Sequence, residues 1–218
     1  MENTICLNMI VKDEGDIIIH TLTNIVEKMT LTYWVICDTG STDNTAELIT
    51  DFFKEKDISG ELIHDEWVDF AHNRTKALEY AFKKTDFVFV FDADDRIEGE
   101  LILPNLERGY AYLMQYGWGI QWKRMPLLDN HIKWYYDGVL HEIITTNEEY
   151  KSEVIKGDYH IATNVVVSAR NKKGPEKYYD DALILVKAYE KQDHLHARYA
   201  FYAGECFRNS NQYLKKIK

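Results

Sequence analysis

The sequence predicts an α/β fold, in which a mostly parallel sheet is flanked by helices and followed by a short α-helical segment. Residues 87–91, Phe-Val-Phe-Val-Phe, are aromatic or β-branched throughout, which is typical of a strand buried on both faces of a sheet. Strand-like and helix-like patterns alternate three times before this strand, and that order indicates parallel strands joined by right-handed crossovers. After residue 175 the apolar residues recur at helical spacing.

The individual elements follow from hydrophobic spacing and from the turn and cap residues between them. In chain order the predicted elements are a strand at 4–11, a helix to about 29, a strand at 33–37, a helix at 44–54, a strand at 61–64, a helix at 69–84 and the strand at 87–91. Acidic residues suit the positive end of the first helix, with Asp13 as its N-cap. Cys6 and Cys37 fall inside predicted strands and are expected to be small core residues.

The composition excludes several classes of function. The 218 residues carry 26 Lys and Arg against 36 Asp and Glu, a formal net charge of −10, so we expect neither a nucleic-acid surface nor an anionic membrane as the main partner. Three widely separated cysteines favour neither a disulfide framework nor a zinc site. No apolar run approaches the roughly 20 residues of a transmembrane span, and the chain begins with a strand rather than a leader, so a cytoplasmic location is expected.

Acidic residues follow two of the predicted strands, at the point where each strand ends. Asp38 follows the strand at 33–37, and Asp92 and Asp94 follow the strand at 87–91. Parallel strands place their carboxyl ends at one edge of a sheet, where ligands bind in open α/β folds, so we expect these acids to surround one ligand. In an extended segment Asp92 and Asp94 point to the same side. Such a pair suits Mg²⁺ or Mn²⁺ shared with phosphate oxygens.

Each of these assignments has a simpler alternative. An Asp-x-Asp sequence can be a solvated acidic turn, and Asp38 can be an Asx residue that forms a turn. Arg74, near the start of the predicted helix at 69–84, can approach a nucleotide from the side or form a surface salt bridge. In the functional interpretation, Asp38 accepts a hydrogen bond from a base or a ribose hydroxyl, and Asp92 or Asp94 holds a diphosphate through a metal ion.

Four segments share their order and spacing with a known family. They are Ile10–Glu14, Cys37–Thr45, His72–Ala77 and Phe91–Asp95. Together they resemble the family 2 glycosyltransferases of GT-A fold, a Rossmann-like sheet flanked by helices, over about residues 4–165. The resemblance implies that Asp38 contacts the nucleotide base, that Arg74 lies near the nucleotide, and that Asp92 and Asp94 bind the ribose and the metal–diphosphate. Many relatives carry two adjacent acids where this chain has Cys37-Asp38-Thr39.

Two further segments supply the remaining candidate groups. Asp137–Glu142 resembles the Gly-x-x-His-Glu segment of family 2 members related to lipopolysaccharide core transferases. An inverting transfer needs a carboxylate that removes the proton of the acceptor hydroxyl, and we expect Glu142 to be this base, with Asp137 as the second candidate. His160 resembles the late histidine that completes the metal site in many GT-A enzymes, and an imidazole nitrogen suits Mn²⁺. As an alternative to the role of base, Glu142 can simply lie at an exposed strand end. As an alternative to the role of metal ligand, His160 can be a core or surface residue.

The region between these motifs is less regular. Its pattern predicts a helix at 106–115 and two strands, 117–125 and 132–136, around an Asp129-Asn130 turn. The region is also the most aromatic of the chain, and flat rings offer apolar faces to sugar C–H bonds. We expect most of these rings to belong to the core and one or two to contact a substrate. The rings are those of Trp118, Trp122, Trp134, Tyr135 and Tyr136.

The C-terminal segment has a different composition. Residues 171–175, Asn-Lys-Lys-Gly-Pro, are typical of a linker, with Pro175 near the first position of a helix. Two helices and the start of a third follow, as at the beginning of a tetratricopeptide-like array. The expected domains are a GT-A catalytic domain at 1–170 and a helical segment at 171–218. Because one helix pair cannot bury both its faces, it either docks on the catalytic domain or belongs to a longer protein, and we favour the longer protein.

These patterns together predict an inverting, metal-dependent glycosyltransferase. The expected donor is a nucleotide diphosphate sugar, specifically a UDP-sugar, the expected cofactor is Mn²⁺ or Mg²⁺, and the expected acceptor is a glycan, a lipid-linked molecule or a protein. One alternative is a nucleotidyltransferase-like enzyme, which usually needs a basic or glycine-rich phosphate loop where this chain is acidic. The other is a non-catalytic interaction module that works through the helical tail.

Overall fold

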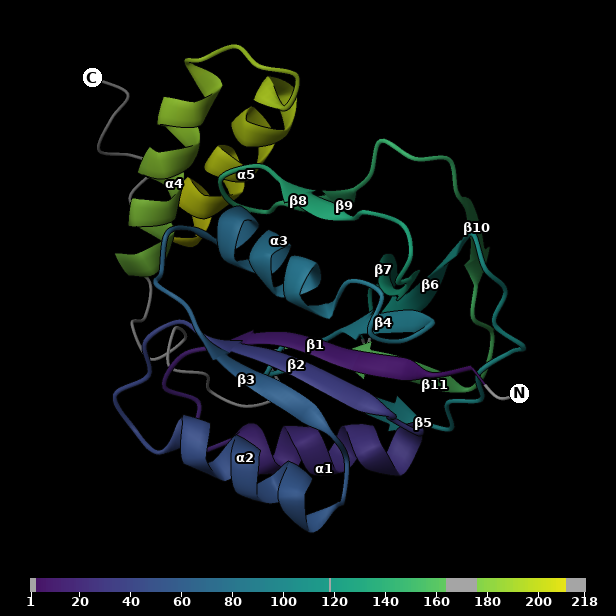
Figure 1. Cartoon of the computed structure of the whole chain (residues 1–218). Helices are drawn as coiled ribbons and strands as arrows, with labels where there is room; N and C mark the ends of the chain where they lie inside the picture. Colours follow the sequence, from purple (N-terminus) through teal and green to yellow (C-terminus); the bar gives the residue numbers. More distant parts are fainter. Residues whose placement is uncertain (1–2, 118, 164–175, 211–218) are drawn as a thin grey trace.

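The computed structural model describes residues 3–117, 119–163 and 176–210, and within them it contains eleven strands and five helices (Figure 1). The strands are β1 (Ile5–Val11), β2 (Tyr33–Asp38), β3 (Gly60–His64), β4 (Phe87–Val90), β5 (Arg96–Gly99), β6 (Tyr110–Tyr116), β7 (Trp122–Asp129), β8 (Tyr135–Asp137), β9 (Ile143–Thr145), β10 (Lys151–Val154) and β11 (Tyr159–Ala162). The helices are α1 (Ile18–Lys28), α2 (Thr45–Glu55), α3 (Phe70–Ala81), α4 (Glu176–Tyr189) and α5 (His196–Asn209).

Nine of the strands form one sheet, and β8 and β9 form a separate hairpin. The order in the large sheet is β3-β2-β1-β4-β7-β6-β11-β5, with β10 paired to β6. The strands β3, β2, β1 and β4 are parallel, whereas β7 runs antiparallel to both of its neighbours, β4 and β6. The predicted α/β fold is therefore confirmed. Its parallel half is the part that carries the alternating strands and helices of the first 91 residues.

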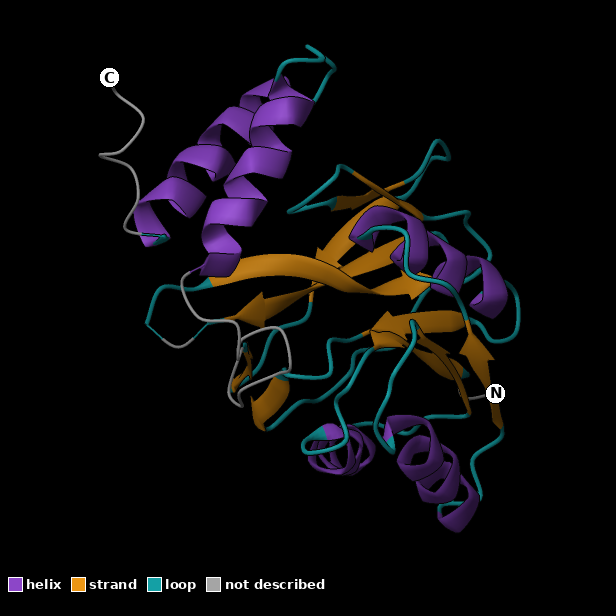
Figure 2. Ribbon diagram, turned by 90° about the vertical axis from the view of Figure 1, so that its left-hand side faces the viewer, coloured by secondary structure: helices purple, strands orange, loops and turns teal. Residues whose placement is uncertain are grey.

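Helices cover both faces of this sheet (Figures 1 and 2). On one face α1 and α2 pack against the sheet, and Leu22 and Phe53 belong to this core. On the other face α3 packs with Leu78 against Cys6 and other sheet residues. Complete burial of a side chain such as Leu22 stabilises the fold by about 2 kcal/mol. Cys6 and Cys37 are free, buried thiols, as expected, and burial raises the pKa of each to about 12.

The central strand β4 is buried on both faces, as its sequence predicts. Phe87 and Phe89 enter the core under α1 and α2, and Val88 and Val90 enter the core under α3. Alternate side chains of a strand point to opposite faces, so an apolar run of this kind fits only between two covered faces.

The irregular region differs from its prediction. The expected helix at 106–115 does not form, and most of this segment belongs to strand β6. Alternate residues of Tyr110–Tyr116 enter the core, and the strand lies between β7 and β11. The expected strand pair at 117–125 and 132–136 does not form. The strand β7 continues to Asp129 and pairs with β4 and β6, whereas β8 pairs with β9. The pairing of strands that are distant in the sequence determines these elements, so the local spacing of apolar residues could not predict them.

The first helix also begins later than expected. The helix α1 starts at Ile18, and no side chain caps its first turn. Asp13 has a positive φ of 54°, and its carboxylate accepts a hydrogen bond from the backbone N–H of Thr42 at 2.6 Å. Asp13 therefore joins the loop after β1 to the loop after β2, rather than capping α1.

The helix pair α4–α5 packs against residues that follow β8. Leu140 is buried in the same core as Ala182 and Ala203 of the two helices. The pair therefore docks on the rest of the chain, which is one of the two arrangements considered from the sequence. The predicted linker at 171–175, with Pro175, and the start of a third helix lie outside the described residues. Within the described residues, no helix has the combined length and apolar character that crossing a membrane requires.

Candidate active site

Asp38 and Asp92 lie at the same edge of the sheet. The strand β1 pairs in parallel with both β2 and β4, with Val11 opposite Asp38 and Asn8 opposite Val90. Neighbouring strands are about 4.8 Å apart, so the ends of β2 and β4 are separated by about 10 Å. The structure therefore brings the two predicted ligand-binding acids to one rim, with the end of β1 between them.

The segment from Asp92 to Asp95 forms a turn between β4 and β5. The backbone N–H of Asp95 donates to the carbonyl of Asp92 at 3.2 Å, and Thr21 of α1 donates its hydroxyl to the carbonyl of Ala93. The extended conformation expected for Asp92–Asp94 is therefore wrong, because the chain turns into β5 immediately. The turn still gathers three carboxylates at the end of β4.

Arg74 of α3 makes ion pairs with two of the predicted site residues. Its Nη2 lies 2.6 Å from Oδ1 of Asp92, and its Nε lies 2.9 Å from Oε1 of Glu142. The guanidinium also lies over the Tyr136 ring, 5.5 Å from the centroid. The side chain of Arg74 is only 15% exposed, so these are not surface salt bridges. Burial lowers the pKa of Arg74, but attraction to Asp92, Tyr136 and Glu142 outweighs burial and raises it.

Arg124 of β7 is a further candidate site residue, which the sequence motifs did not single out. Its Nη1 lies 3.8 Å from Oδ2 of Asp92, and its guanidinium lies over the Tyr116 ring. It belongs to none of the motifs, and only the antiparallel pairing of β7 with β4 and β6 brings it to this edge. The sequence signal that was available is that Arg124 falls within the predicted strand at 117–125. The sequence did not show that this strand lies beside the aspartates.

The pKa values of Asp92 and Asp95 in this turn are shifted in opposite directions. Burial raises the pKa of Asp92, but the ion pair with Arg74 and the charge of Arg124 lower it below its ordinary value. For Asp95, burial and the charges of Asp92 and Asp94 raise the pKa well above the ordinary value. The repulsion between the neighbouring carboxylates Asp92, Asp94 and Asp95 would be relieved by a hard divalent cation, which prefers oxygen ligands.

Asp38 serves as the Asx residue of its own turn. Its Oδ1 accepts hydrogen bonds from the backbone N–H groups of Gly40 at 3.1 Å and Ser41 at 2.8 Å. Gly40 has a φ of +98°, a conformation that glycine adopts without strain. The other oxygen, Oδ2, lies 3.7 Å from Nδ1 of His64. The turn role considered from the sequence is therefore present, and it uses only one of the two carboxylate oxygens.

The contacts described for His160 and Asp137 are with residues outside this group. His160 is on β11, where its Nε2 lies 3.9 Å from Oε2 of Glu98. Oδ2 of Asp137 lies 2.7 Å from Nε2 of His194, beside the helix pair. Among the described residues, no group of three or more His, Cys, Asp or Glu is spaced to hold a metal ion. His160 as a metal ligand and Asp137 as a base therefore stay predictions.

The aromatic residues divide between core and surface. Trp134 is buried and donates its indole N–H to the carbonyl of Asp129 at 2.9 Å, whereas Trp122 is 40% exposed. Of these five rings, Tyr136 contacts the candidate site, because the Arg74 guanidinium lies over it, and it also lines a polar hollow. Trp118 lies outside the described residues.

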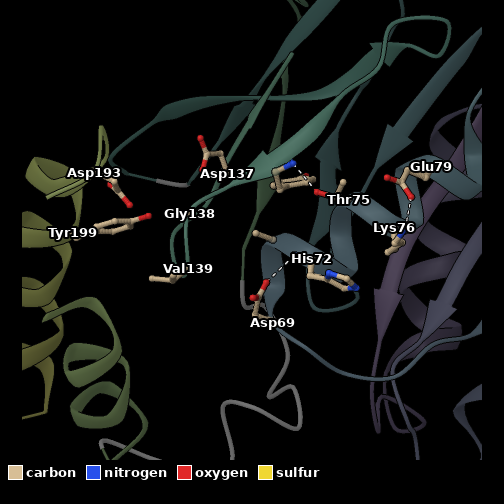
Figure 3. Close-up of a pocket in the computed structure, with 12 residues that line it drawn as sticks. Asp69, His72, Thr75, Lys76, Glu79, Asp137, Gly138, Val139, Asp193 and Tyr199 are labelled. Atoms are coloured by element: carbon tan, nitrogen blue, oxygen red, sulfur yellow. Dashed lines mark hydrogen bonds and ion pairs between the residues drawn. The ribbon is translucent and has the colours of Figure 1, made fainter. Parts of the chain in front are cut away.

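The polar hollow has a volume of about 450 Å³ and lies between α3, the chain after β8 and α5 (Figure 3). His72 and Lys76 of α3 line it, together with Asp137 and, from the helical segment, Asp193 and Tyr199. Asp38, Asp92 and Asp94 do not line it. The hollow is therefore distinct from the acidic edge and adjoins the chain that leads to Glu142.

A mixed α/β sheet with helices on both faces and acidic residues at the carboxyl edge of its parallel strands is the arrangement expected of the GT-A class. The chain belongs to glycosyl transferase family 2, whose model matches residues 6–155. No curated protein matches the chain.

The solved structures that are similar to this chain include the following three. S. aureus TarS has a TM-score of 0.50 and 16% identity, and the match covers 99% of this chain and 46% of that one. The mannosyltransferase PcManGT from Pyrobaculum calidifontis, in complex with GDP-Man and Mn²⁺, has a TM-score of 0.39 and 24% identity over 44% of this chain and 29% of that one. GalNAc-T7, with UDP, GalNAc and Mn²⁺, has a TM-score of 0.46 and 14% identity over 75% of this chain and 35% of that one. The chain spans less than half the length of each.

Proposed function

We propose that this chain transfers a sugar from a nucleotide diphosphate sugar, specifically a UDP-sugar, to an acceptor hydroxyl, with inversion and with a divalent metal ion. Membership of glycosyl transferase family 2 supports the reaction class. The observation that carries the proposal is the position of Arg74, which contacts both Asp92 at the end of β4 and Glu142, the candidate base. One side chain thereby joins the donor edge to the group that would act on the acceptor.

The donor is proposed to bind along the edge from Asp38 to the acidic turn. The Oδ2 of Asp38 would accept from the base or a ribose hydroxyl, while Asp92 and Asp94 would hold Mn²⁺ or Mg²⁺. When bound, the cation offsets the charge that grows on the leaving diphosphate. Arg124, which is half-exposed, would reach the same diphosphate. His160, whose Nε2 lies 3.9 Å from Oε2 of Glu98, is proposed as an additional ligand because an imidazole nitrogen suits Mn²⁺.

Glu142 is proposed to remove the proton of the attacking hydroxyl. A single in-line displacement inverts the sugar and needs one base, and Glu142 is the candidate that contacts the donor edge through Arg74. Asp137 instead contacts His194. The ion pair orients the Glu142 carboxylate before substrate arrives, so little reorganisation is left for the reaction itself. The proposed acceptor remains a glycan, a lipid-linked molecule or a protein.

A thermal-shift panel tests this function directly. A ligand that binds only the folded form raises apparent stability, by about 2.7 kcal/mol when present at 100 times its dissociation constant. We expect UDP and a UDP-sugar to raise Tm when Mn²⁺ is present and to have little effect when it is chelated. The absence of any shift with uridine or guanine nucleotides in Mn²⁺ or Mg²⁺ would overturn the proposal. NMR of the transferred sugar's anomeric proton then tests inversion.

A further inference from the structure

The helix pair α4–α5 holds the backbone immediately before Glu142. The His141 ring stacks on Tyr202 of α5, with 4.0 Å between centroids and 9° between planes. The His141 carbonyl accepts a hydrogen bond from Nε of Arg198 at 2.8 Å, and the Arg198 guanidinium lies over the same Tyr202 ring. Both the side chain and the carbonyl of His141 are therefore fixed by α5, one residue from the candidate base.

The chain on the other side of His141 is fixed by the same helices. Leu140 is only 7% exposed and packs in one core with Leu185 of α4 and Ala203 of α5. Figure 3 shows Tyr199 of α5 beside Gly138 and Val139 of this loop. These apolar contacts anchor the loop, while Glu142 at its end points to α3.

The backbone of the loop adopts conformations that need such support. His141 has a φ of 53°, a left-handed conformation that is uncommon and strained for a residue other than glycine. Gly138 has a φ of +111°, and a Cβ added there would lie 3.3 Å from Leu195 Cδ1 of the helical segment. Left-handed backbone of this kind persists where the surrounding contacts impose it. Here α5 supplies those contacts.

We propose that the helix pair α4–α5 is a positioning element of the active site, in which Arg198 and Tyr202 hold His141 so that Glu142 reaches Arg74. The family model ends at residue 155, whereas the pair begins at Glu176, so this role is additional to the matched region. The catalytic meaning of the position rests on the proposed function of Glu142. The mechanical part, that α5 sets the contact between Glu142 and Arg74, does not.

The test compares Tyr202→Ala and Arg198→Ala with Arg208→Ala in the full chain. Arg208 is on the same helix and pairs with Glu205. Arg208→Ala is therefore a matched control, because it removes a guanidinium from α5 but leaves the contacts between α5 and His141 in place. The first readout is the Arg74 Nε–Hε signal in a ¹H–¹⁵N spectrum, assigned by its absence in Arg74→Lys. We expect this signal to move in Tyr202→Ala and Arg198→Ala and to stay in place in Arg208→Ala.

The second readout separates positioning from general loss of structure. We expect kcat for sugar transfer from a UDP-sugar to fall at least tenfold in Tyr202→Ala, while UDP affinity in Mn²⁺ changes less than twofold, because Arg74 keeps its separate contact with Asp92 through Nη2. Tyr202→Phe retains the ring and should keep the Arg74 signal in place. If the alanine variants fail to fold, Arg198→Lys, which removes the Nε donor to the His141 carbonyl, takes their place and should move the signal. An unmoved Arg74 signal in folded Tyr202→Ala and Arg198→Ala overturns the proposal. Absent nucleotide binding in the unsubstituted protein would instead overturn the proposed function, and the Arg74 signal would still be informative.

Discussion

Nε of Arg74 lies 2.9 Å from Oε1 of Glu142, although the two residues belong to a helix of the parallel half and to a loop that packs on the C-terminal helices. The same guanidinium contacts Asp92 through Nη2. A planar guanidinium can hold two carboxylates in fixed directions, which an ammonium group cannot do. Arg74 therefore couples the position of the candidate base to the acidic turn.

This coupling predicts that Arg74→Lys strongly lowers activity. The substitution keeps the buried charge but leaves one of the two carboxylates without its partner, and a lost charged hydrogen bond is worth about 1.5–3 kcal/mol. We expect kcat/KM for sugar transfer to fall about tenfold to a hundredfold. Lys54→Ala, on the exposed surface of α2, serves as the control. Activity within twofold of the original in a folded Arg74→Lys protein would contradict this role.

Asp94→Ala should abolish the divalent-dependent part of nucleotide binding. The cation is proposed to bridge the carboxylates of the acidic turn and the diphosphate, so removal of a ligand weakens both partners together. Calorimetry of UDP with and without Mn²⁺ measures the difference. Asp51→Ala removes an exposed carboxylate of α2 and should leave the Mn²⁺ dependence intact. Normal UDP affinity in Asp94→Ala would count against the metal site.

Asp38 can be dissected with two substitutions. Asp38→Asn keeps an Oδ1 acceptor for Gly40 and Ser41 and removes the charge, whereas Asp38→Ala removes the turn as well. We expect both to weaken UDP binding about tenfold, equivalent to about 1.4 kcal/mol. Only Asp38→Ala should also lower the free energy of unfolding, by about 1–2 kcal/mol. Unchanged UDP affinity in Asp38→Asn would leave Asp38 with its turn role alone.

Arg124→Gln should weaken the binding of diphosphates more than that of monophosphates. The side chain is half-exposed and lies 3.8 Å from Asp92, so its proposed partner is the phosphate farther from the nucleoside. We expect UDP affinity in Mn²⁺ to fall by a factor of about three to ten and UMP affinity to change less, with the difference reduced at high salt. Equal losses for UDP and UMP would exclude a specific diphosphate contact.

We expect Asp129 to make a pH-dependent contribution to the free energy of unfolding. Burial raises the pKa of Asp129, but hydrogen bonds from Arg108, Gly109 and His131 lower it below the ordinary value. A carboxyl group whose pKa is lowered by folding stabilises the protein above its unfolded pKa, about 3.9, and loses that contribution as pH falls through the folded pKa. Asp129→Asn should therefore lower the free energy of unfolding by about 2 kcal/mol at pH 7.

Urea unfolding at several pH values measures this dependence. The difference between the original protein and Asp129→Asn should shrink as pH falls below about 4, because the original carboxyl group becomes neutral as well. Asp51→Asn, at an exposed position of α2, provides the comparison. A difference that stays constant down to pH 3 would show that the substitution acts through packing rather than charge.

The sequence by itself determined the parallel half of the fold and the acids at its edge. Apolar runs such as Phe87–Phe91 and the helical spacing of Leu22 and Ile25 are local signals, and parallel strands joined by crossovers place Asp38 and Asp92 at one rim. These features depend only on period and order along the chain. They could therefore be predicted without knowledge of any contact.

Only the tertiary structure decided the second half and the connections of the site. The strand β6, expected as a helix, depends on pairing with β7 and β11, and Arg124 reaches Asp92 only because β7 runs antiparallel beside β4. The contact of Arg74 with Glu142, and the support of His141 by α5, join segments that are far apart in the sequence. Such contacts follow from packing between distant elements, whose energies no local pattern of residues contains.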